Sequence, residues 1–177
     1  RELPDSLYAL ESDPGPANQI RASVTYNHVV EGCLALTGYY GWGKVCNSRG
    51  ILPGMQRIIK HIGDDERRHM AWGTFTCRRH VAADDAMWQV VIDRMGELMP
   101  LALATVDSGN SEWGDHPPFG IDPAELSAYA ADKLTRRLGA IESARGADLK
   151  LIDRDASPEA LEEKFHAEDQ LVLSPAN

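Results

Sequence analysis

The sequence predicts an all-α protein built as a helical bundle. Apolar residues recur at spacings of three and four over long stretches, which is typical of one face of an α-helix. The chain contains no alternating apolar and polar runs joined by Asn-Gly or Asp-Gly turns, so nothing in it predicts a β-hairpin. Its 177 residues are enough for one domain with a substantial core.

The first half of the chain predicts two long helices. Residues 1–15 are rich in Pro and Gly and are expected to form turns. A first helix is predicted for about 17–48, and Gly50 suits a left-handed cap at its end. The second restarts after Pro53 and extends to about residue 83. Because the connection is short, we expect the two helices to be antiparallel neighbours.

The second half predicts two further long helices and a tail. A third helix is expected for about 84–106, followed by a loop rich in Gly, Pro and Asn. Asp122 and Pro123 then provide an N-cap and a first helical residue for the fourth helix, which should end near Gly146. Residues 147–177 are charged and predict an acidic tail with one short helix.

Charge and hydropathy exclude several classes of protein. A net charge of −9 argues against a nucleic-acid partner, which would require a clustered basic face. No apolar run is long enough to span a membrane, and no signal peptide is visible. The three cysteines lie within helical patterns, so we expect reduced thiols in a cytoplasmic protein. Since the chain begins with Arg1, it is also expected to be part of a longer protein.

The stretch "GDDERRHMAWG" places Glu66 and His69 three residues apart on the second helix. A carboxylate and an imidazole at this spacing project from one face and can bind a divalent cation of the manganese, iron or zinc type. By itself the pair is weak evidence for a metal. The alternative is a surface glutamate beside a buried, hydrogen-bonded histidine.

Glu31 strengthens the metal hypothesis. It lies in "HVVEGCLALTGYY", among mostly apolar neighbours, where an unpaired charge would be very costly. Antiparallel packing about the connection at residues 49–53 places Glu31 at the level of Glu66. One glutamate facing a Glu-x-x-His pair is half of the ligand set of a dinuclear carboxylate site in a ferritin-like bundle.

These motifs resemble a known family. The segments "VTYNHVVEGCLALTGYY", "LPGMQRIIKHIGDDERRHMAWGTF" and "RRHVAAD" are similar to the ligand-binding oxidases that are homologues of the ribonucleotide reductase small subunit. The resemblance covers roughly residues 1–145. It implies a ferritin-like bundle, of which residues 1–146 would be the C-terminal part. It also implies a manganese and iron site (alternatively di-iron) that reacts with oxygen, a long-chain fatty acid ligand and a homodimer.

The resemblance also implies roles for individual residues. Glu31, Glu66 and His69 would be metal ligands, and Asp65 would orient a histidine ligand from the partner helix pair. Tyr26 would be the catalytic tyrosine that becomes ether-linked to a valine. Five residues are about 140° of turn in a regular α-helix, so Tyr26 and Glu31 share a face only if the helix is distorted or the tyrosine approaches from the edge.

The remaining ligands and the valine would lie upstream of Arg1. The chain therefore carries about half of the ligands, and we expect it to be inactive alone. Glu142 with Glu163 and His166 could formally complete the set, but a charged exterior turn explains the last two more simply. The small residues Gly32, Ala35 and Gly38 either permit close helix packing or, in the family, leave room for an acyl chain.

Three other functions remain open at the level of the sequence. The chain could be part of a ribonucleotide reductase small subunit, although the tail "DQLVLSPAN" lacks the aromatic character expected for docking to a large subunit. It could be a non-catalytic helical bundle in which Glu31 and Glu66 are paired with Arg67 or Lys44. Iron storage would require a cage-forming oligomer.

Overall fold

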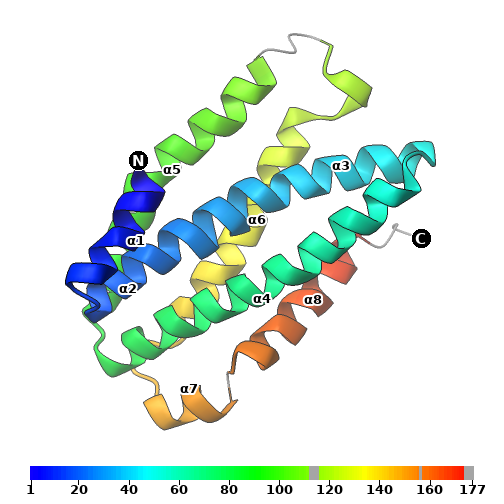
Figure 1. Cartoon of the computed structure of the whole chain (residues 1–177). Helices are drawn as coiled ribbons and strands as arrows, with labels where there is room; N and C mark the ends of the chain where they lie inside the picture. The colour runs from blue at the N-terminus through cyan, green and yellow to red at the C-terminus, as the bar shows by residue number, and fades with distance from the viewer. Residues whose placement is uncertain (112–115, 156, 174–177) are drawn as a thin grey trace.

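The computed structural model describes residues 1–111, 116–155 and 157–173, and every regular element in them is a helix (Figure 1). The predicted all-α class is therefore confirmed for the described residues. The elements are α1 (Glu2–Ser12), α2 (Pro16–Ser23), η1 (Val24–Ala35), α3 (Leu36–Arg49), α4 (Pro53–Ala83), α5 (Met87–Ser111), η2 (Pro118–Gly120), α6 (Pro123–Glu142), α7 (Leu149–Asp155) and α8 (Pro158–Leu173).

The two predicted long helices form an antiparallel pair. The segments α2, η1 and α3 follow one another without a break, and α4 returns alongside η1 and α3 (Figure 1). Gly50 caps α3 with a φ of 60°, as its position predicted. Leu52 also takes a left-handed conformation, with a φ of 52°. This tight turn sets the register in which the two helices face each other.

The first long helix differs from a regular α-helix in its middle. The 12 residues of η1 form a π-helix, in which backbone hydrogen bonds link residues five apart. π-Helical turns are rare and occur often at functional sites. The conformation changes which side chains share a face, and this becomes important at the candidate site.

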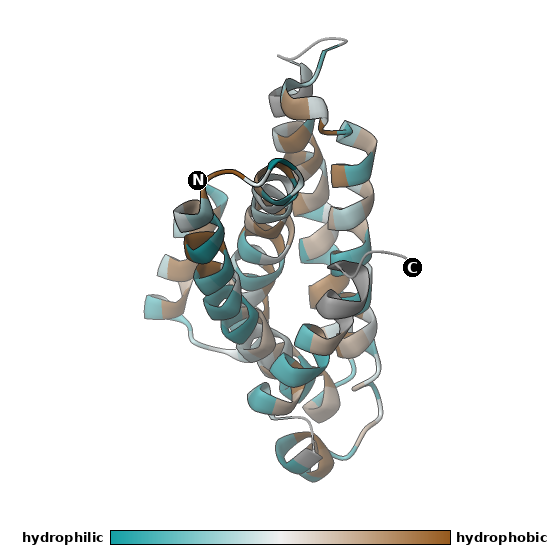
Figure 2. Ribbon diagram, turned by 90° about the vertical axis from the view of Figure 1, so that its right-hand side faces the viewer, coloured by the Kyte–Doolittle hydropathy of each residue, from teal (hydrophilic) through white to brown (hydrophobic). Residues whose placement is uncertain are grey.

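The helices α5 and α6 lie behind this pair in Figure 1, and both contact η1. The core between them is apolar, with Val24, Cys77, Val81, Val91 and Ile141 fully buried. The helices carry both hydrophilic and hydrophobic residues, as amphipathic helices of a bundle do (Figure 2). None of the described helices is long and apolar enough to cross a membrane.

The fourth predicted helix begins as expected, while the loop before it is shorter than predicted. Asp122 accepts a hydrogen bond from the backbone N–H of Ala124 and so caps α6, which ends at Glu142. Residues 107–111, expected in the loop, continue α5 instead. Residues 112–115 lie outside the described residues, and 118–120 form the single 3₁₀ turn η2.

Two predictions at the ends of the chain were wrong. Residues 2–12 form α1 rather than turns, because the prolines and glycine of this region cluster at its two ends. The tail contains two helices, α7 and α8, rather than one short helix. Leu161 and Phe165 of α8 are buried against Ala71 of α4, and the Arg137 guanidinium lies 5.3 Å from the centre of the Phe165 ring. The acidic tail therefore has an apolar face that packs on the bundle.

We expect Phe165→Ala to detach α8 from α4. The change removes a buried aromatic side chain that is 3% exposed, which costs about 3 kcal/mol in a typical core. Amide hydrogen exchange should accelerate in α8, and urea denaturation should show the lost stability. Glu163→Ala, an exposed change on the same helix, is the matched control. Unchanged exchange in α8 of Phe165→Ala would contradict the packing described here.

Candidate metal centre

The structure brings together the three predicted metal ligands. Glu31 comes from η1, and Glu66 and His69 come from α4. Each offers one ligand atom, and these atoms all lie within 4.8 Å of one another. Among the residues that the structure describes, no other group of His, Cys, Asp and Glu meets this description. The short turn at Gly50 and Leu52 produces this alignment, since it sets the level at which η1 meets α4.

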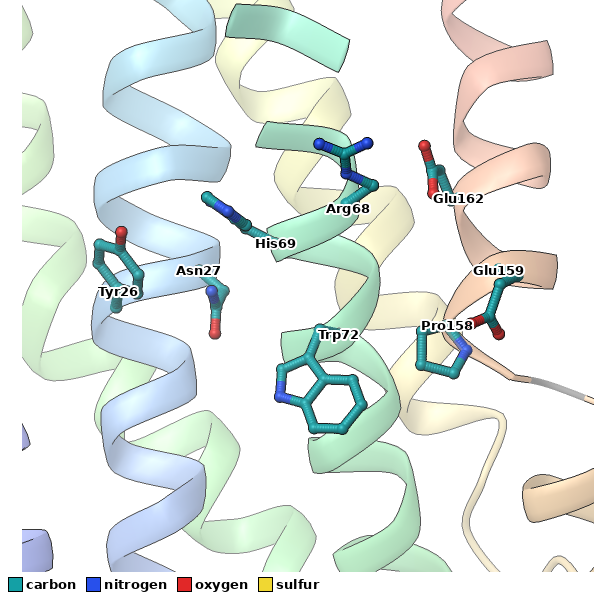
Figure 3. A pocket seen from close by; sticks show the side chains of 8 residues that line it. All are labelled: Tyr26, Asn27, Arg68, His69, Trp72, Pro158, Glu159 and Glu162. Carbon is teal, nitrogen blue, oxygen red and sulfur yellow. The ribbon is translucent and has the colours of Figure 1, made fainter. Parts of the chain in front are cut away.

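Glu31 is the most buried member, with 4% of its surface exposed. Its Oε1 lies 2.9 Å from His69 Nδ1, and its Oε2 accepts a hydrogen bond of 3.1 Å from the side-chain amide of Asn27. The His69 side chain is about half exposed, so it can present a ring nitrogen to an ion. Figure 3 shows His69 extending from α4 toward η1, with Asn27 in the gap between the two helices.

The electrostatics of the group favour a cation. Burial and the nearby charge of Glu31 raise the pKa of Glu66, since two close carboxylates repel each other when both are ionised. Glu66 Oε2 is buried and has no hydrogen-bond partner among the described residues, although His69 Nδ1 lies 3.5 Å away. A divalent cation would satisfy this oxygen and remove the repulsion. Two carboxylates and an imidazole are also suitable donors for manganese or iron, so the residues present fit such a metal.

Tyr26 joins the group through the π-helix. A hydrogen bond from its phenol to Glu31, followed by burial and the charges of Glu31 and Glu66, raises the pKa of Tyr26. In a π-helix, residues five apart lie one turn apart, so Tyr26 and Glu31 face the same side. The distorted helix that the five-residue spacing required is therefore present. The catalytic role of Tyr26 stays a prediction.

Three residues at this centre were missed by the sequence analysis. The Tyr39 hydroxyl donates to Glu66 Oε1 at 3.4 Å, and burial followed by the charge of Glu66 raises the pKa of Tyr39. Asn27 was detectable as a polar residue in an apolar run, four positions before Glu31. Gly73, which lies against Asn27, carried a weaker signal as a small residue on the buried face of α4.

Asp65 lies outside the group. Its side chain is exposed and pairs with Arg68 on the same helix, one turn away. The histidine that it was predicted to orient would come from a partner helix pair, so this role stays a prediction.

The small residues of η1 and α3 occupy different surroundings. A Cβ added to Gly32 would lie 2.9 Å from the Asn27 carbonyl oxygen and 3.3 Å from Met70 Sδ, so Gly32 permits close packing. Ala35 is half-buried. Gly38 is exposed, and no described atom lies within 4 Å of an added Cβ. Their role in a ligand pocket stays a prediction.

Two alternatives do not agree with the structure. Glu142, Glu163 and His166 are all exposed and do not join the cluster of Glu31, so they do not complete its ligand set in the described chain. The exposed positions of these three residues on α6 and α8 account for their polar side chains without a metal ligand role.

The ion pairs proposed for an inert bundle are also different from those observed. Lys44 pairs with Glu125, and Arg67 pairs with Asp64. The two carboxylates of the cluster are therefore not neutralised by the bases that the inert bundle required.

A pocket of about 540 Å³ opens beside the cluster (Figure 3). It lies between η1, α4 and the start of α8. The lining residues are Tyr26, Asn27, Arg68, His69, Trp72, Pro158, Glu159 and Glu162. The cluster is thus accessible from the side on which Tyr26 and His69 are exposed.

Comparison with known proteins links this geometry to a family of oxidases. No family model matches the chain. The R2-like ligand-binding oxidase from Sulfolobus acidocaldarius has 28% sequence identity and a TM-score of 0.74, over 86% of this chain and 50% of that one. An R2-like ligand-binding oxidase with an aerobically reconstituted Mn/Fe cofactor has 30% identity and a TM-score of 0.73, over 78% of this chain and 50% of the other. A glycine-to-phenylalanine variant of such an oxidase, with the same cofactor, has 29% identity and a TM-score of 0.75, over 79% of this chain and 53% of the other.

This chain is similar in fold and sequence to the R2-like ligand-binding oxidases. The predicted resemblance is therefore confirmed, and with it the ferritin-like character of the helical fold. The chain spans about half the length of the solved structures that it matches. The activity, ligands and partners of the whole protein accordingly belong to the proposals below.

We expect Glu66→Gln to stabilise the metal-free chain at neutral pH. Burial and Glu31 raise the pKa of Glu66, so above the ordinary value of 4.5 the folded chain keeps a proton that the unfolded chain has lost. The free energy of unfolding therefore falls as the pH rises through this range, and a glutamine abolishes that contribution.

Urea denaturation in the presence of a chelator measures this effect. Glu66→Gln should give a higher free energy of unfolding at neutral pH than the wild type, with a flatter dependence on pH. Glu163→Gln on the exposed face of α8 should change neither quantity. A variant that is less stable than the wild type at neutral pH would contradict the assigned electrostatics.

Proposed function

We propose that this chain is part of an oxygen-activating oxidase with a dinuclear manganese and iron carboxylate site. The observation that carries the proposal is the convergence of Glu31, Glu66 and His69 within 4.8 Å, between helices of a fold similar to that of Mn/Fe oxidases. The chain supplies one lone glutamate and one Glu-x-x-His pair, which is half of the set found in dinuclear carboxylate bundles. Di-iron loading is the alternative.

The other half of the set would come from two further helices packed on the exposed face of α4. This face carries exposed large apolar residues on both sides of His69. They are Met55, Ile58 and Ile62 before it and Trp72 after it, all at least 36% exposed. Large apolar residues gathered on one exposed face are typical of a surface that is covered by another element. These residues therefore support a bundle completed around the metal centre.

In the completed site, Glu31, Glu66 and His69 would hold metal. When bound, the metals supply electrons and open positions for the reaction with oxygen. The chain's own groups have distinct tasks. Glu31 accepts a hydrogen bond from Asn27, which orients it, and Glu66 accepts one from Tyr39. These donors hold the carboxylate oxygens in place for a cation.

Tyr26 is the internal substrate in this proposal. Its phenol loses the O–H hydrogen, and a valine of the other half loses a C–H hydrogen, as a carbon–oxygen bond forms between them. Two protons and two electrons are released in total, and both pass to oxygen, so the step balances. The phenol lies beside Glu31, which accepts its hydrogen bond and holds it toward the centre.

The resemblance further supports a long-chain fatty acid ligand, a homodimer and a cytoplasmic location. The pocket of about 540 Å³ is large enough for part of an acyl chain, and Tyr26, Trp72 and Pro158 give it apolar surface. A bound acyl chain would not by itself mean that the protein converts an external substrate.

We expect the chain to bind one cobalt(II) ion weakly, because three protein ligands are sufficient for a single divalent cation. Equilibrium titration, followed by the visible absorption of cobalt(II), measures this binding. Glu31→Ala, Glu66→Ala and His69→Ala should each abolish it. Glu163→Ala and His166→Ala should retain it, as these side chains are exposed on α8. Equal binding by Glu31→Ala and the wild type would refute the centre.

We expect the cross-link in a protein that carries both halves of the bundle. After manganese(II), iron(II) and air are added, peptide mass spectrometry should find the Tyr26 peptide joined to a second peptide, with two hydrogens lost. Tyr26→Phe should abolish the product. Tyr40→Phe is the matched control, because Tyr40 bonds Glu125 on α6 instead of the metal cluster. A cross-link that persists in Tyr26→Phe would exclude this role.

A further inference from the structure

Asn27 occupies a notch in α4. Its side chain is buried, with 8% of the residue exposed, and it lies directly over Gly73. A Cβ added to Gly73 would lie 2.5 Å from the Asn27 Cβ and 2.6 Å from its Cγ, which is closer than real atoms approach. Only a glycine at residue 73 therefore lets the Asn27 side chain pass between η1 and α4.

The notch places the Asn27 amide against one oxygen of a ligand. Asn27 Nδ2 donates to Glu31 Oε2 at 3.1 Å, while Glu31 Oε1 is 2.9 Å from His69 Nδ1. The two oxygens of this carboxylate thus have different partners. Rotation of the carboxylate plane about its terminal bond would break the contact with Asn27, so the amide fixes the orientation in which one carboxylate oxygen faces the histidine.

The backbone of Asn27 lies within the π-helix. Its carbonyl oxygen is one π-helical turn before Gly32, where an added Cβ would be 2.9 Å away, and this is a contact within the helix's own backbone. The close fit of the side chain against Gly73 is therefore the tertiary contact that holds Asn27 in place.

We propose that Asn27 is a positioning residue for the metal ligand Glu31, and that Gly73 is present to admit it. The inference rests on the proposed function, since it assigns a task only if Glu31 holds a cation. An asparagine suits this task because its amide donates a hydrogen bond and carries no charge. An aspartate in the same notch would place a third carboxylate beside Glu31 and Glu66. Groups that orient metal ligands change metal affinity by about 10- to 100-fold when they are removed.

The test is cobalt(II) titration of the 177-residue chain, three single variants and one double variant, combined with thermal denaturation. Asn27→Ala should lower cobalt affinity about 10-fold and should lower the melting temperature. Gly73→Ala should do the same, because its methyl group displaces the Asn27 side chain. Gly63→Ala is the matched control on the same helix, as no described atom beyond the adjacent backbone of α4 lies within 4 Å of its added Cβ.

The double variant Asn27→Gly with Gly73→Ala separates positioning from packing. A glycine at residue 27 also removes the Cβ that would lie 2.5 Å from the new methyl group, so this methyl group fills the notch and the melting temperature should recover from that of Gly73→Ala toward that of the wild type. Cobalt affinity should remain about 10-fold low, because no amide holds Glu31. Recovery of both quantities would show that Asn27 is only a packing residue and would overturn the inference.

The remaining outcomes are also decisive. Wild-type affinity in Asn27→Ala would overturn the inference and leave the proposed function standing. Failure of the wild-type chain to bind cobalt at Glu31 would instead overturn the proposed function, and the positioning role would fall with it.

Discussion

The structure depends on a carboxylate placed inside an apolar helix. Glu31 is 4% exposed, and a buried charge is tolerated only when its oxygens are satisfied. Asn27, Tyr26 and His69 all interact with it, and they come from both sides of the interface between η1 and α4. The second carboxylate, Glu66, raises the electrostatic cost further. This arrangement suits a cation, because binding relieves the repulsion between the two carboxylates.

The backbone of η1 makes this arrangement possible. In a regular α-helix, Tyr26 and Glu31 would point in different directions, and the π-helix brings them to one face. The same winding moves the Asn27 carbonyl against Gly32, while Gly73 lets the Asn27 side chain enter between the helices. Local geometry and helix packing are thus coupled, since the close approach of α4 holds the side chains of η1 in place.

The similarity to R2-like ligand-binding oxidases agrees with the gathering of Glu31, Glu66 and His69 between η1 and α4. The chain spans about half the length of those structures, and its cluster has the composition of half of a dinuclear ligand set. The proposed completion of the bundle would also cover the exposed apolar residues of α4 and the half-exposed His69. Next to this face, α8 packs on Ala71 of α4 through Leu161 and Phe165.

Residue spacing alone was sufficient for the helical class, for the antiparallel pairing about Gly50 and for the meeting of Glu31 with Glu66 and His69. These features follow from period and loop length, which are local properties of a sequence. The π-helix, the notch at Gly73 and the hydrogen bond of Tyr39 required the tertiary structure. Each depends on how closely two helices approach, and that distance is set by side chains far apart in the chain. The packing of α8 on α4 was also missed. Its two buried residues, Leu161 and Phe165, contact a helix far away in the chain, and the many charges of the tail hid this apolar face in the sequence.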